Sequence, residues 1–171
     1  MKKIGVISDT HGKVLEGGFI KFLNACDEIW HAGDIGNIRV IENLEQIKPV
    51  KAVFGNIDGR GIRSKWPEYQ EFTCEAVDVF ITHIGGRPGK YDPSVRDLLK
   101  NNSPDLFICG HSHILKVQYD KNHDFLYVNP GAAGNSGFHR VRTAVRFQID
   151  GENIKDLEVY EVDRNTRTNT T

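Results

Sequence analysis

The stretch Ile4-Gly5-Val6-Ile7-Ser8-Asp9-Thr10-His11-Gly12 decides the fold of this chain. Its apolar half predicts a short buried strand from Lys3 to Ser8, and Asp9 and His11 follow at the C-terminal end of that strand. Open α/β sheets bind their ligands at this end of the strands. Because side chains two residues apart on a strand share a face, Asp9 and His11 are placed to hold one cation together. Taken alone, the triplet is equally typical of a turn closed by an Asp side chain.

The pattern of an apolar run followed by a polar turn recurs twice downstream. A strand over residues 28–31 leads to Gly33-Asp34, and a strand over 50–54 leads to Gly55-Asn56-Ile57-Asp58. Apolar residues at helical spacing predict helices over 16–25 and 37–46, the second capped by Asn37. The order βαβαβ predicts a parallel sheet with crossover helices, and therefore an α/β fold.

The second half of the chain is richer in strands. We expect strands over 70–76 and 77–82, the latter leading to His83, and a helix over 93–101. A buried strand over 105–109 leads to Gly110-His111-Ser112-His113. Residues 60–67 are basic and irregular, which predicts a surface loop near the site. The remaining segments predict a second sheet packed on the first, with strands over 116–119, 125–128, 142–149 and 154–162.

The composition fits one domain without a polymeric partner. The 171 residues carry 22 Lys plus Arg against 23 Asp plus Glu, so no overall field favours a nucleic acid or an anionic membrane. No apolar run is long enough to span a bilayer or to act as a signal peptide, which predicts a cytoplasmic protein. We expect a single domain over residues 1–162 and a frayed polar tail over 163–171. A homo-oligomer is compatible with this sequence.

The cysteines do not suggest a metal site or a disulfide framework. Cys26, Cys74 and Cys109 are odd in number and widely spaced, without a C-x-x-C pair. This pattern favours small buried hydrophobic side chains over disulfides or a zinc knuckle.

Polar side chains with ligand chemistry follow five strand ends. They are Asp9, His11, Asp34, Asn56, His83, His111 and His113. Imidazole nitrogen suits Zn, Fe, Mn or Ni, and carboxylate oxygen suits harder ions such as Mn. One ion with four ligands would leave several of these groups without a function, whereas two divalent ions about 3.5–4 Å apart would use all of them. The set therefore predicts a dinuclear centre, with manganese as the first choice and zinc, iron or nickel as alternatives.

Each of these residues has an ordinary structural explanation when it is considered alone. Asp34 can cap a helix, Asn56 can occupy a turn, and His83 can be a hydrogen-bonded core residue. The pair His111 and His113 can be hydrogen-bonded surface groups. Packing does not explain why all of them follow strand ends, and their joint occurrence favours ligation.

Three further histidines have other interpretations. His31 precedes the Gly-Asp turn and is placed to support a ligand or to pack. His123 lies in a charged turn and is expected to be solvated. His139, beside Arg140 and Arg142, is either a contact to substrate phosphate or a surface residue.

The ordered motifs resemble those of a known enzyme family. The series Asp9-x-His11, Gly33-Asp34, Gly55-Asn56-x-Asp58, His83 and Gly110-His111-x-His113 resembles the calcineurin-like metallophosphoesterase superfamily, and its spacing is similar to that of the small single-domain YfcE-type phosphodiesterases. The resemblance runs from Lys3 to about Phe147. It implies a four-layer α/β/β/α sandwich of two mixed β-sheets.

The resemblance also implies roles for individual residues. Asp9, His11 and His113 would hold the first metal, and Asn56, His83 and His111 the second, with Asp34 bridging the two. The catalytic set would be Asp34, Asn56, Asp58 and His83, with Asp58 orienting its neighbours. The implied activity is hydrolysis of a small phosphate ester, most simply a diester, by a hydroxide held between the two ions.

One position departs from the family pattern. Many relatives carry histidine where this chain has Ile57, and that histidine can protonate the leaving oxygen. A general acid contributes roughly 10²–10⁴ in rate, so we expect a preference for activated aryl diesters over alkyl esters.

Two other functions are compatible with the same residues. One is a phosphomonoesterase or nucleotidase that uses the same site. The other is a metal-free interaction module, as the retromer scaffold subunit is within this superfamily, although a scaffold has no reason to keep seven costly polar groups at one sheet edge. The chain has neither a Gly-x-Ser-x-Gly elbow nor a Gly-x-x-x-x-Gly-Lys loop, which argues against a serine hydrolase and a P-loop nucleotidase.

Overall fold

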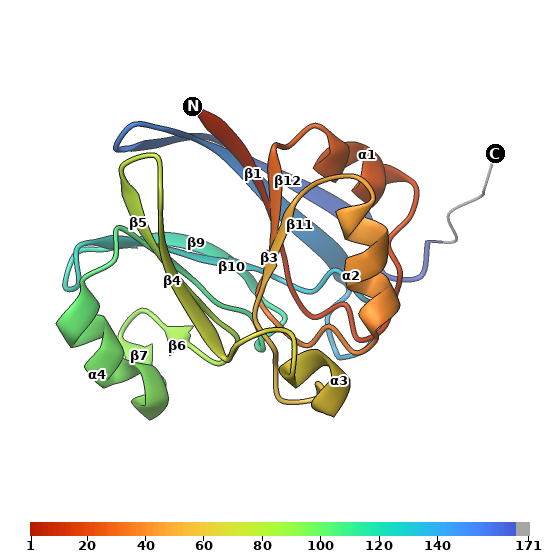
Figure 1. Ribbon diagram of the computed structural model, residues 1–171, viewed down its shortest axis with the longest axis horizontal. Coiled ribbons are helices and arrows are strands. Elements are labelled where there is room, and N and C mark those ends of the chain that lie inside the picture. The colour runs from red at the N-terminus through yellow and green to blue at the C-terminus, as the bar shows by residue number, and fades with distance from the viewer. Residues whose placement is uncertain (167–171) are drawn as a thin grey trace.

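Two five-stranded β-sheets pack face to face in the computed structural model, which describes residues 1–166 (Figure 1). The first sheet has the strand order β12-β11-β1-β2-β3. Its strands are β1 (Lys2–Ile7), β2 (Glu28–His31), β3 (Val50–Ala52), β11 (Val141–Asp150) and β12 (Asn153–Asp163). The pairs β1–β2 and β2–β3 are parallel, as the βαβαβ order predicts.

The second sheet has the strand order β4-β5-β8-β10-β9. Its strands are β4 (Tyr69–Cys74), β5 (Val77–Thr82), β8 (Leu106–Ile108), β9 (Leu115–Asp120) and β10 (Phe125–Pro130). The prediction that all of the C-terminal strands build this sheet is wrong, because β11 pairs antiparallel with β1 from Lys2↔Ile149 to Val6↔Val145 and carries β12 into the first sheet. Hydrophobic alternation shows that a segment is a strand, but not which free sheet edge it closes.

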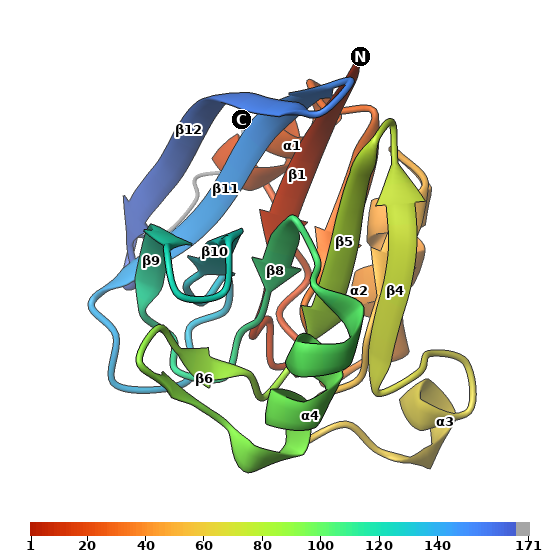
Figure 2. The same ribbon diagram turned by 90° about the vertical axis from the view of Figure 1, so that its left-hand side faces the viewer.

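Helices cover the outer face of each sheet, so the domain has four layers (Figure 2). α1 (Gly18–Asn24) and α2 (Ile38–Glu45) lie on the first sheet, and α4 (Pro93–Asn102) lies on the second. Three buried apolar clusters fill the three spaces between layers. Trp30 and Phe147 pack between the sheets, Phe19 and Leu44 pack beneath the first pair of helices, and Phe107 packs beneath α4.

The two longer helices begin at residues with good capping chemistry. The Asn37 side chain accepts a hydrogen bond from the Arg39 backbone N–H at 3.0 Å at the start of α2. At α4, the Asp92 carboxylate accepts from the Ser94 N–H at 2.9 Å, and Pro93 occupies the first turn. Each cap satisfies a backbone donor that has no partner within its helix.

Two segments for which no helix or strand was predicted contain short regular elements. Residues 60–67 were expected to be irregular, but they begin with the helix α3 (Arg60–Arg63), because Ile62 is buried against the first sheet's helical layer. The loop after His83 contains a hairpin of β6 (Gly86–Arg87) and β7 (Lys90–Tyr91).

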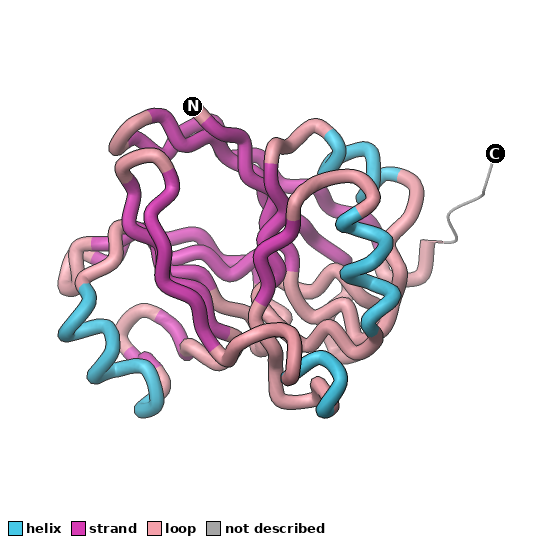
Figure 3. Tube along the Cα trace, viewed as in Figure 1, coloured by secondary structure: helices cyan, strands magenta, loops and turns pink. Residues whose placement is uncertain are grey.

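The loops that follow the parallel strands gather at one end of the sandwich (Figure 3).

The three cysteines are free and buried, as predicted. Of the tail expected over 163–171, Asp163 ends β12 and the Thr166 N–H donates to its carbonyl at 3.1 Å, while residues 167–171 lie outside the described part of the chain. No helix within residues 1–166 is long and apolar enough to cross a membrane.

Candidate metal centre

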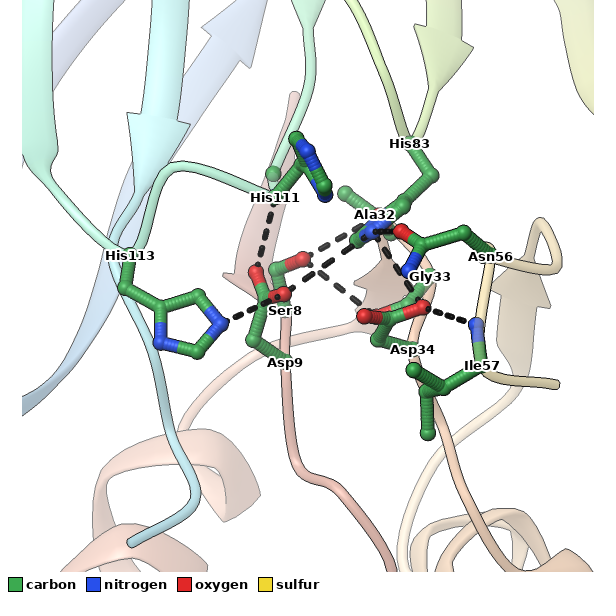
Figure 4. Close-up of polar contacts among 12 residues, drawn as sticks. Ser8, Asp9, Ala32, Gly33, Asp34, Asn56, Ile57, His83, His111 and His113 are labelled. Atoms are coloured by element: carbon green, nitrogen blue, oxygen red, sulfur yellow. Dashed lines mark hydrogen bonds and ion pairs between the residues drawn. The ribbon is translucent and has the colours of Figure 1, made fainter. Parts of the chain in front are cut away.

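The seven predicted ligands come together at the end of the sheets where β1, β2, β3, β5 and β8 terminate, and Figure 4 labels all of them except His11. They are Asp9, His11, Asp34, Asn56, His83, His111 and His113. Six of them form two groups of three, and within each group the donor atoms all lie within 4.8 Å of one another. Segments far apart in the sequence therefore build one polar centre.

The first group contains Asp9, His11 and His113. Oδ1 of Asp9 lies 3.1 Å from Nε2 of His113 and 3.8 Å from Nε2 of His11. The two imidazole Nε2 atoms are 3.3 Å apart. Three donor atoms thus point into one small space, which is the arrangement that a divalent cation requires.

The second group contains Asp34, His83 and His111. Oδ1 of Asp34 lies 3.2 Å from Nε2 of His83, and Oδ1 of Asn56 lies 3.1 Å from the same nitrogen. The His83 and His111 rings meet edge to face, with centroids 5.2 Å apart. Asn56 thus joins this group through His83.

Asp34 has one carboxylate oxygen toward each group. Its Oδ1 faces His83 at 3.2 Å, and its Oδ2 lies 3.5 Å from Nε2 of His11. The Ile57 backbone N–H donates to Oδ1 at 3.0 Å and fixes the orientation of the carboxylate. A carboxylate placed in this way would contact an ion held in either donor set.

Asp9 supplies a direct test of whether a cation fits. Its side chain is 0% exposed, and Oδ1 is one of the buried polar atoms without a hydrogen-bond partner among the described residues. An unpartnered oxygen of this kind is costly to bury. Three imidazole nitrogens, those of His11, His83 and His113, surround it at 3.1 to 3.9 Å. A cation among these acceptors would satisfy the oxygen, so the residues present fit a metal.

The carboxylates of the centre are held in the ionised form that ligation requires. Burial raises the pKa of Asp9, but the neighbouring His11 and His113 outweigh it and hold the pKa well below its usual range. Burial likewise raises the pKa of Asp34, and the contact with His83 reverses the effect and lowers it.

A backbone acceptor fixes the orientation of His83. Its Nδ1 lies 2.8 Å from the Ala32 carbonyl oxygen, so Nδ1 carries the proton and donates it. The Nε2 lone pair then faces Asp34 and Asn56. A ligating imidazole commonly donates its other N–H in this way, which sets its tautomer and its direction.

His113 is oriented by a residue that the sequence did not assign to the metal centre. Its Nδ1 lies 3.2 Å from Nδ1 of His139, whose Nε2 lies 2.9 Å from the Gly134 carbonyl oxygen. Because that carbonyl only accepts, His139 donates from Nε2 and accepts at Nδ1 a hydrogen bond from the Nδ1–H of His113. The Nε2 lone pair of His113 is thereby left free to face Asp9. The two sequence interpretations of His139, phosphate contact and surface residue, both missed this role.

Asp58 connects the ligand loops through hydrogen bonds to their backbone. Its carboxylate accepts hydrogen bonds from the backbone N–H groups of Ile35, Gly36 and Gly55, at 3.1, 2.7 and 2.7 Å. The side chain is 3% exposed, and all three partners belong to the turns after β2 and β3. Asp58 therefore ties together the loops that carry Asp34 and Asn56, which is an orienting function.

His31 also supports the site through hydrogen bonds. It accepts from the Gly33 N–H through Nδ1 at 3.2 Å, and its Nε2 lies 2.9 Å from Oγ1 of Thr10. The residue is 0% exposed, and burial lowers its pKa to about 4. His31 is therefore neutral and holds Thr10 beside the first two ligands. His123 is exposed, as expected, and it also contacts Asp120 at 3.1 Å.

The ligand turns adopt a backbone conformation that is uncommon for these residues. Positive φ values between 47° and 68° occur at Asp9, His11, Asp34, His111 and His113. Such values cost energy for residues with a side chain and concentrate at functional sites. Sequence periodicity does not reveal them.

Glycines allow the strand ends to approach one another closely. A methyl group added at Gly55 would lie 2.1 Å from Oδ1 of Asp34, and one added at Gly110 would lie 2.0 Å from Oγ of Ser8. Both distances are shorter than any tolerated contact. The glycines of the Gly-Asn and Gly-His motifs are therefore required by the packing of the ligand loops.

Two cavities are lined by residues of the second group and by Asn56. One, of about 340 Å³, is lined by Asn56 and His83, and the other, of about 710 Å³, is lined by His111. Asp92 lies on the wall of both. His83 and His111 thus each line a space that is large enough for a small organic group.

Comparison with known proteins agrees with this geometry. Residues 1–152 match the model of the calcineurin-like phosphoesterase superfamily domain. A probable metallophosphoesterase of Methanothermobacter thermautotrophicus is 31% identical over 161 residues, which cover 91% of this chain and 90% of that protein.

Solved structures share the fold at lower sequence identity. A structure described as a novel archaeal phosphodiesterase superimposes with a TM-score of 0.68 at 22% identity, covering 94% of this chain and 99% of that one. Vps29 of Entamoeba histolytica, crystallised with Zn²⁺, gives 0.70 at 17% identity, covering 95% and 99%. From the matched family model and the curated relative, this chain belongs to the calcineurin-like metallophosphoesterase superfamily.

Proposed function

We propose that this protein is a metal-dependent phosphodiesterase that hydrolyses a small phosphate diester at the centre built by the two ligand groups. The observation that carries the proposal is the position of Asp34, whose two oxygens face His83 and His11 at 3.2 and 3.5 Å. Two divalent ions, when bound, supply an acidified water for attack at phosphorus and positive charge for the phosphate. No nucleophilic side chain is then needed.

The chain's own residues hold and orient these ions. Asp9, His11 and His113 form the first set of ligands, and His83, His111 and Asn56 form the second, with Asp34 shared between them. Mixed nitrogen and oxygen donors suit manganese first, and zinc, iron or nickel as alternatives. The zinc-bound Vps29 structure supports the general capacity of this fold to hold such ions.

The two cavities support a diester in preference to a monoester. A diester has two esterified groups, and His83 and His111 each line a separate cavity. A monoester would occupy only one of them. The similarity in fold to an archaeal phosphodiesterase supports the same choice.

The surroundings of the second group favour a leaving group that needs no proton. Ile57 occupies the position where many relatives have histidine, and its side chain is 46% exposed beside the Asp34 carboxylate. An isoleucine side chain cannot donate a proton. We therefore propose that aryl diesters are better substrates than alkyl esters. The ratio of their hydrolysis rates should reflect the missing general acid, which contributes roughly 10²–10⁴ in rate.

The metal-free scaffold reading is less well supported. A scaffold would bury Oδ1 of Asp9 permanently without a partner. A phosphomonoesterase or nucleotidase at the same centre remains the second candidate, because the ligands do not distinguish the two substrate classes.

Hydrolysis by the metal-loaded protein tests the proposal. Wild-type protein reconstituted with Mn²⁺ should hydrolyse bis(p-nitrophenyl) phosphate faster than p-nitrophenyl phosphate, and Asp34→Asn should lower the rate about 10²-fold or more. Faster hydrolysis of the monoester would favour the second candidate. No hydrolysis of either ester by protein that binds the metal would overturn the proposed function.

A further inference from the structure

The larger of the two cavities, beside His111, is surrounded by positive charge. Its volume is about 710 Å³, and Arg87, Lys90, Arg96 and Lys116 line it. They come from β6, β7, α4 and β9, so the charges converge from four elements. The chain as a whole has a net charge of −1, which makes this concentration of cations local.

These cations are not neutralised by neighbouring carboxylates. Within residues 1–166, none of the four makes an ion pair with Asp or Glu inside 4.0 Å, whereas Lys2, Lys51 and Arg146 elsewhere do. The one carboxylate on the cavity wall, Asp92, caps α4 by accepting from the N–H and Oγ of Ser94 at 2.9 and 2.6 Å. Arg96 donates from Nε to the Tyr91 carbonyl oxygen at 3.0 Å, whereas the charges of Arg87, Lys90 and Lys116 remain available to a ligand.

The floor of the cavity is aromatic and offers little hydrogen bonding. Tyr91 and Tyr127 are only 5% and 2% exposed. The Tyr91 hydroxyl donates to Asp120 at 2.5 Å, and the Tyr127 hydroxyl donates to the Gly86 carbonyl at 2.7 Å. Ile114, 65% exposed, adds an apolar side to the wall. The lining suits a ligand with an apolar or flat body that carries an anion.

The smaller cavity has a different character. Its arginine, Arg63, donates to the carbonyl oxygens of Asp58 and Gly55 at 2.6 and 3.1 Å. Its guanidinium also lies 4.3 Å from the centroid of the Phe54 ring, and Glu68 adds a negative charge to the wall. An anionic group is thus favoured on the His111 side of the centre and not on the His83 side.

We propose that the cavity beside His111 binds a second phosphate of the substrate. The substrate class is then a phosphodiester in which one esterified group carries a further phosphate, while the other group occupies the smaller cavity. This inference rests on the proposed function, and it adds the charge and the orientation of the substrate. Water adds to the phosphorus at the metal centre, the bond to the leaving oxygen breaks, and the second phosphate is not altered.

Two substrates with the same leaving group test the inference. They are the p-nitrophenyl ester of thymidine 5′-phosphate and the same ester with an added 3′-phosphate. Wild-type protein loaded with Mn²⁺ should show a kcat/KM ratio of about tenfold or more in favour of the ester with the 3′-phosphate, because several cations contact a dianion. Added salt should reduce the ratio. Hydrolysis of both esters at equal kcat/KM would overturn the inference.

Variants locate the preference in the cavity. Arg87→Gln combined with Lys116→Gln should bring the ratio close to one. Lys21→Gln is the control. It removes a positive charge from the exposed face of α1, away from the cavity lining, and should leave the ratio unchanged. A ratio that survives in the double variant, or falls equally in the control, would overturn the assignment to this cavity.

Equilibrium binding separates the inference from the proposed function. Calorimetry on the Mn²⁺-loaded protein should show tighter binding of thymidine 3′,5′-bisphosphate than of thymidine 5′-monophosphate, and the double variant should lose the difference. That result without hydrolysis of either ester would support the cavity and contradict the proposed function. Equal affinity for the two nucleotides would contradict the cavity, whatever the rates of hydrolysis.

Discussion

Nδ1 of His113 and Nδ1 of His139 lie 3.2 Å apart, and the proton between them leaves the Nε2 lone pair of His113, 3.1 Å from Oδ1 of Asp9, free to bind a cation. The carbonyl oxygen of Gly134 fixes the direction of this chain of hydrogen bonds by accepting from Nε2 of His139 at 2.9 Å. A residue outside the ligand set thus selects the tautomer of a ligand.

Removing this support should weaken the first ligand group. We expect His139→Ala to lower the affinity for Mn²⁺ by about 10- to 100-fold, measured by calorimetry. His139→Asn should retain much of the affinity, because its side-chain oxygen can accept from His113 in place of Nδ1. His123→Ala, outside the centre, is the control. Equal affinities in wild type and His139→Ala would show that His113 orients itself without help.

A methyl group at Gly55 should displace Asp34. The added carbon would lie 2.1 Å from Oδ1, so the carboxylate or its loop must move. We expect Gly55→Ala to lose tenfold or more of its Mn²⁺ affinity, in line with about 10- to 100-fold for disturbed ligand support. Gly61→Ala, in α3 with no atom within 4 Å of the added carbon, is the matched control and should bind as wild type does. Equal affinity in both variants would mean that Asp34 is not held as described.

Restoring an acid at position 57 should change substrate preference. Ile57→His places an imidazole beside the second ligand group, where it can protonate a leaving oxygen. We expect hydrolysis of alkyl diesters to rise by roughly 10²-fold and hydrolysis of p-nitrophenyl diesters to change little, because nitrophenolate leaves without a proton. The two rates are compared at equal metal loading. An equal increase for both substrates would point to an effect other than acid catalysis.

His31 should make the metal-free protein sensitive to acid. Its pKa falls from 6.5 to about 4 on burial, so between these values the unfolded chain binds a proton that the folded chain does not. The free energy of unfolding should therefore decrease as pH falls from about 6.5 to about 4, by about 3 kcal/mol in total.

Urea unfolding at several pH values measures this dependence. Asp9, Asp34 and His83 titrate nearby in both wild type and His31→Asn, so the difference between the two proteins isolates His31. The variant should be less stable near neutral pH, since Thr10 loses its partner, but its stability should fall less steeply with acid. Parallel curves for the two proteins would contradict the assignment.

Much of the fold follows from local sequence patterns. The parallel strands β1, β2 and β3 could be predicted because apolar runs alternate with helical periodicity between them, and right-handed crossovers leave few topologies. The cap of α2 at Asn37 could be predicted for a similar reason. The position of β11 in the first sheet could not be predicted, because its pairing with the free edge of β1 depends on contacts between residues far apart in the chain.

The same distinction applies to the metal centre. Asp34 and His83 could be chosen from sequence because each has ligand chemistry and closely follows a predicted strand, with a glycine one or two residues away. His139 could not be chosen from sequence, because its function depends on the position of its loop next to His113. The left-handed backbone conformation of Asp9 could not be predicted from sequence either, since it arises from packing between loops.

The number of metal ions that activity requires tests the central claim most directly. Wild-type protein stripped of metal is titrated with Mn²⁺, and bound ions per chain and hydrolysis of bis(p-nitrophenyl) phosphate are measured on the same samples. The two ligand groups predict saturation at two ions per chain, with activity appearing as the second site fills. Saturation at one ion, or full activity before the second ion binds, would contradict a dinuclear centre joined by Asp34.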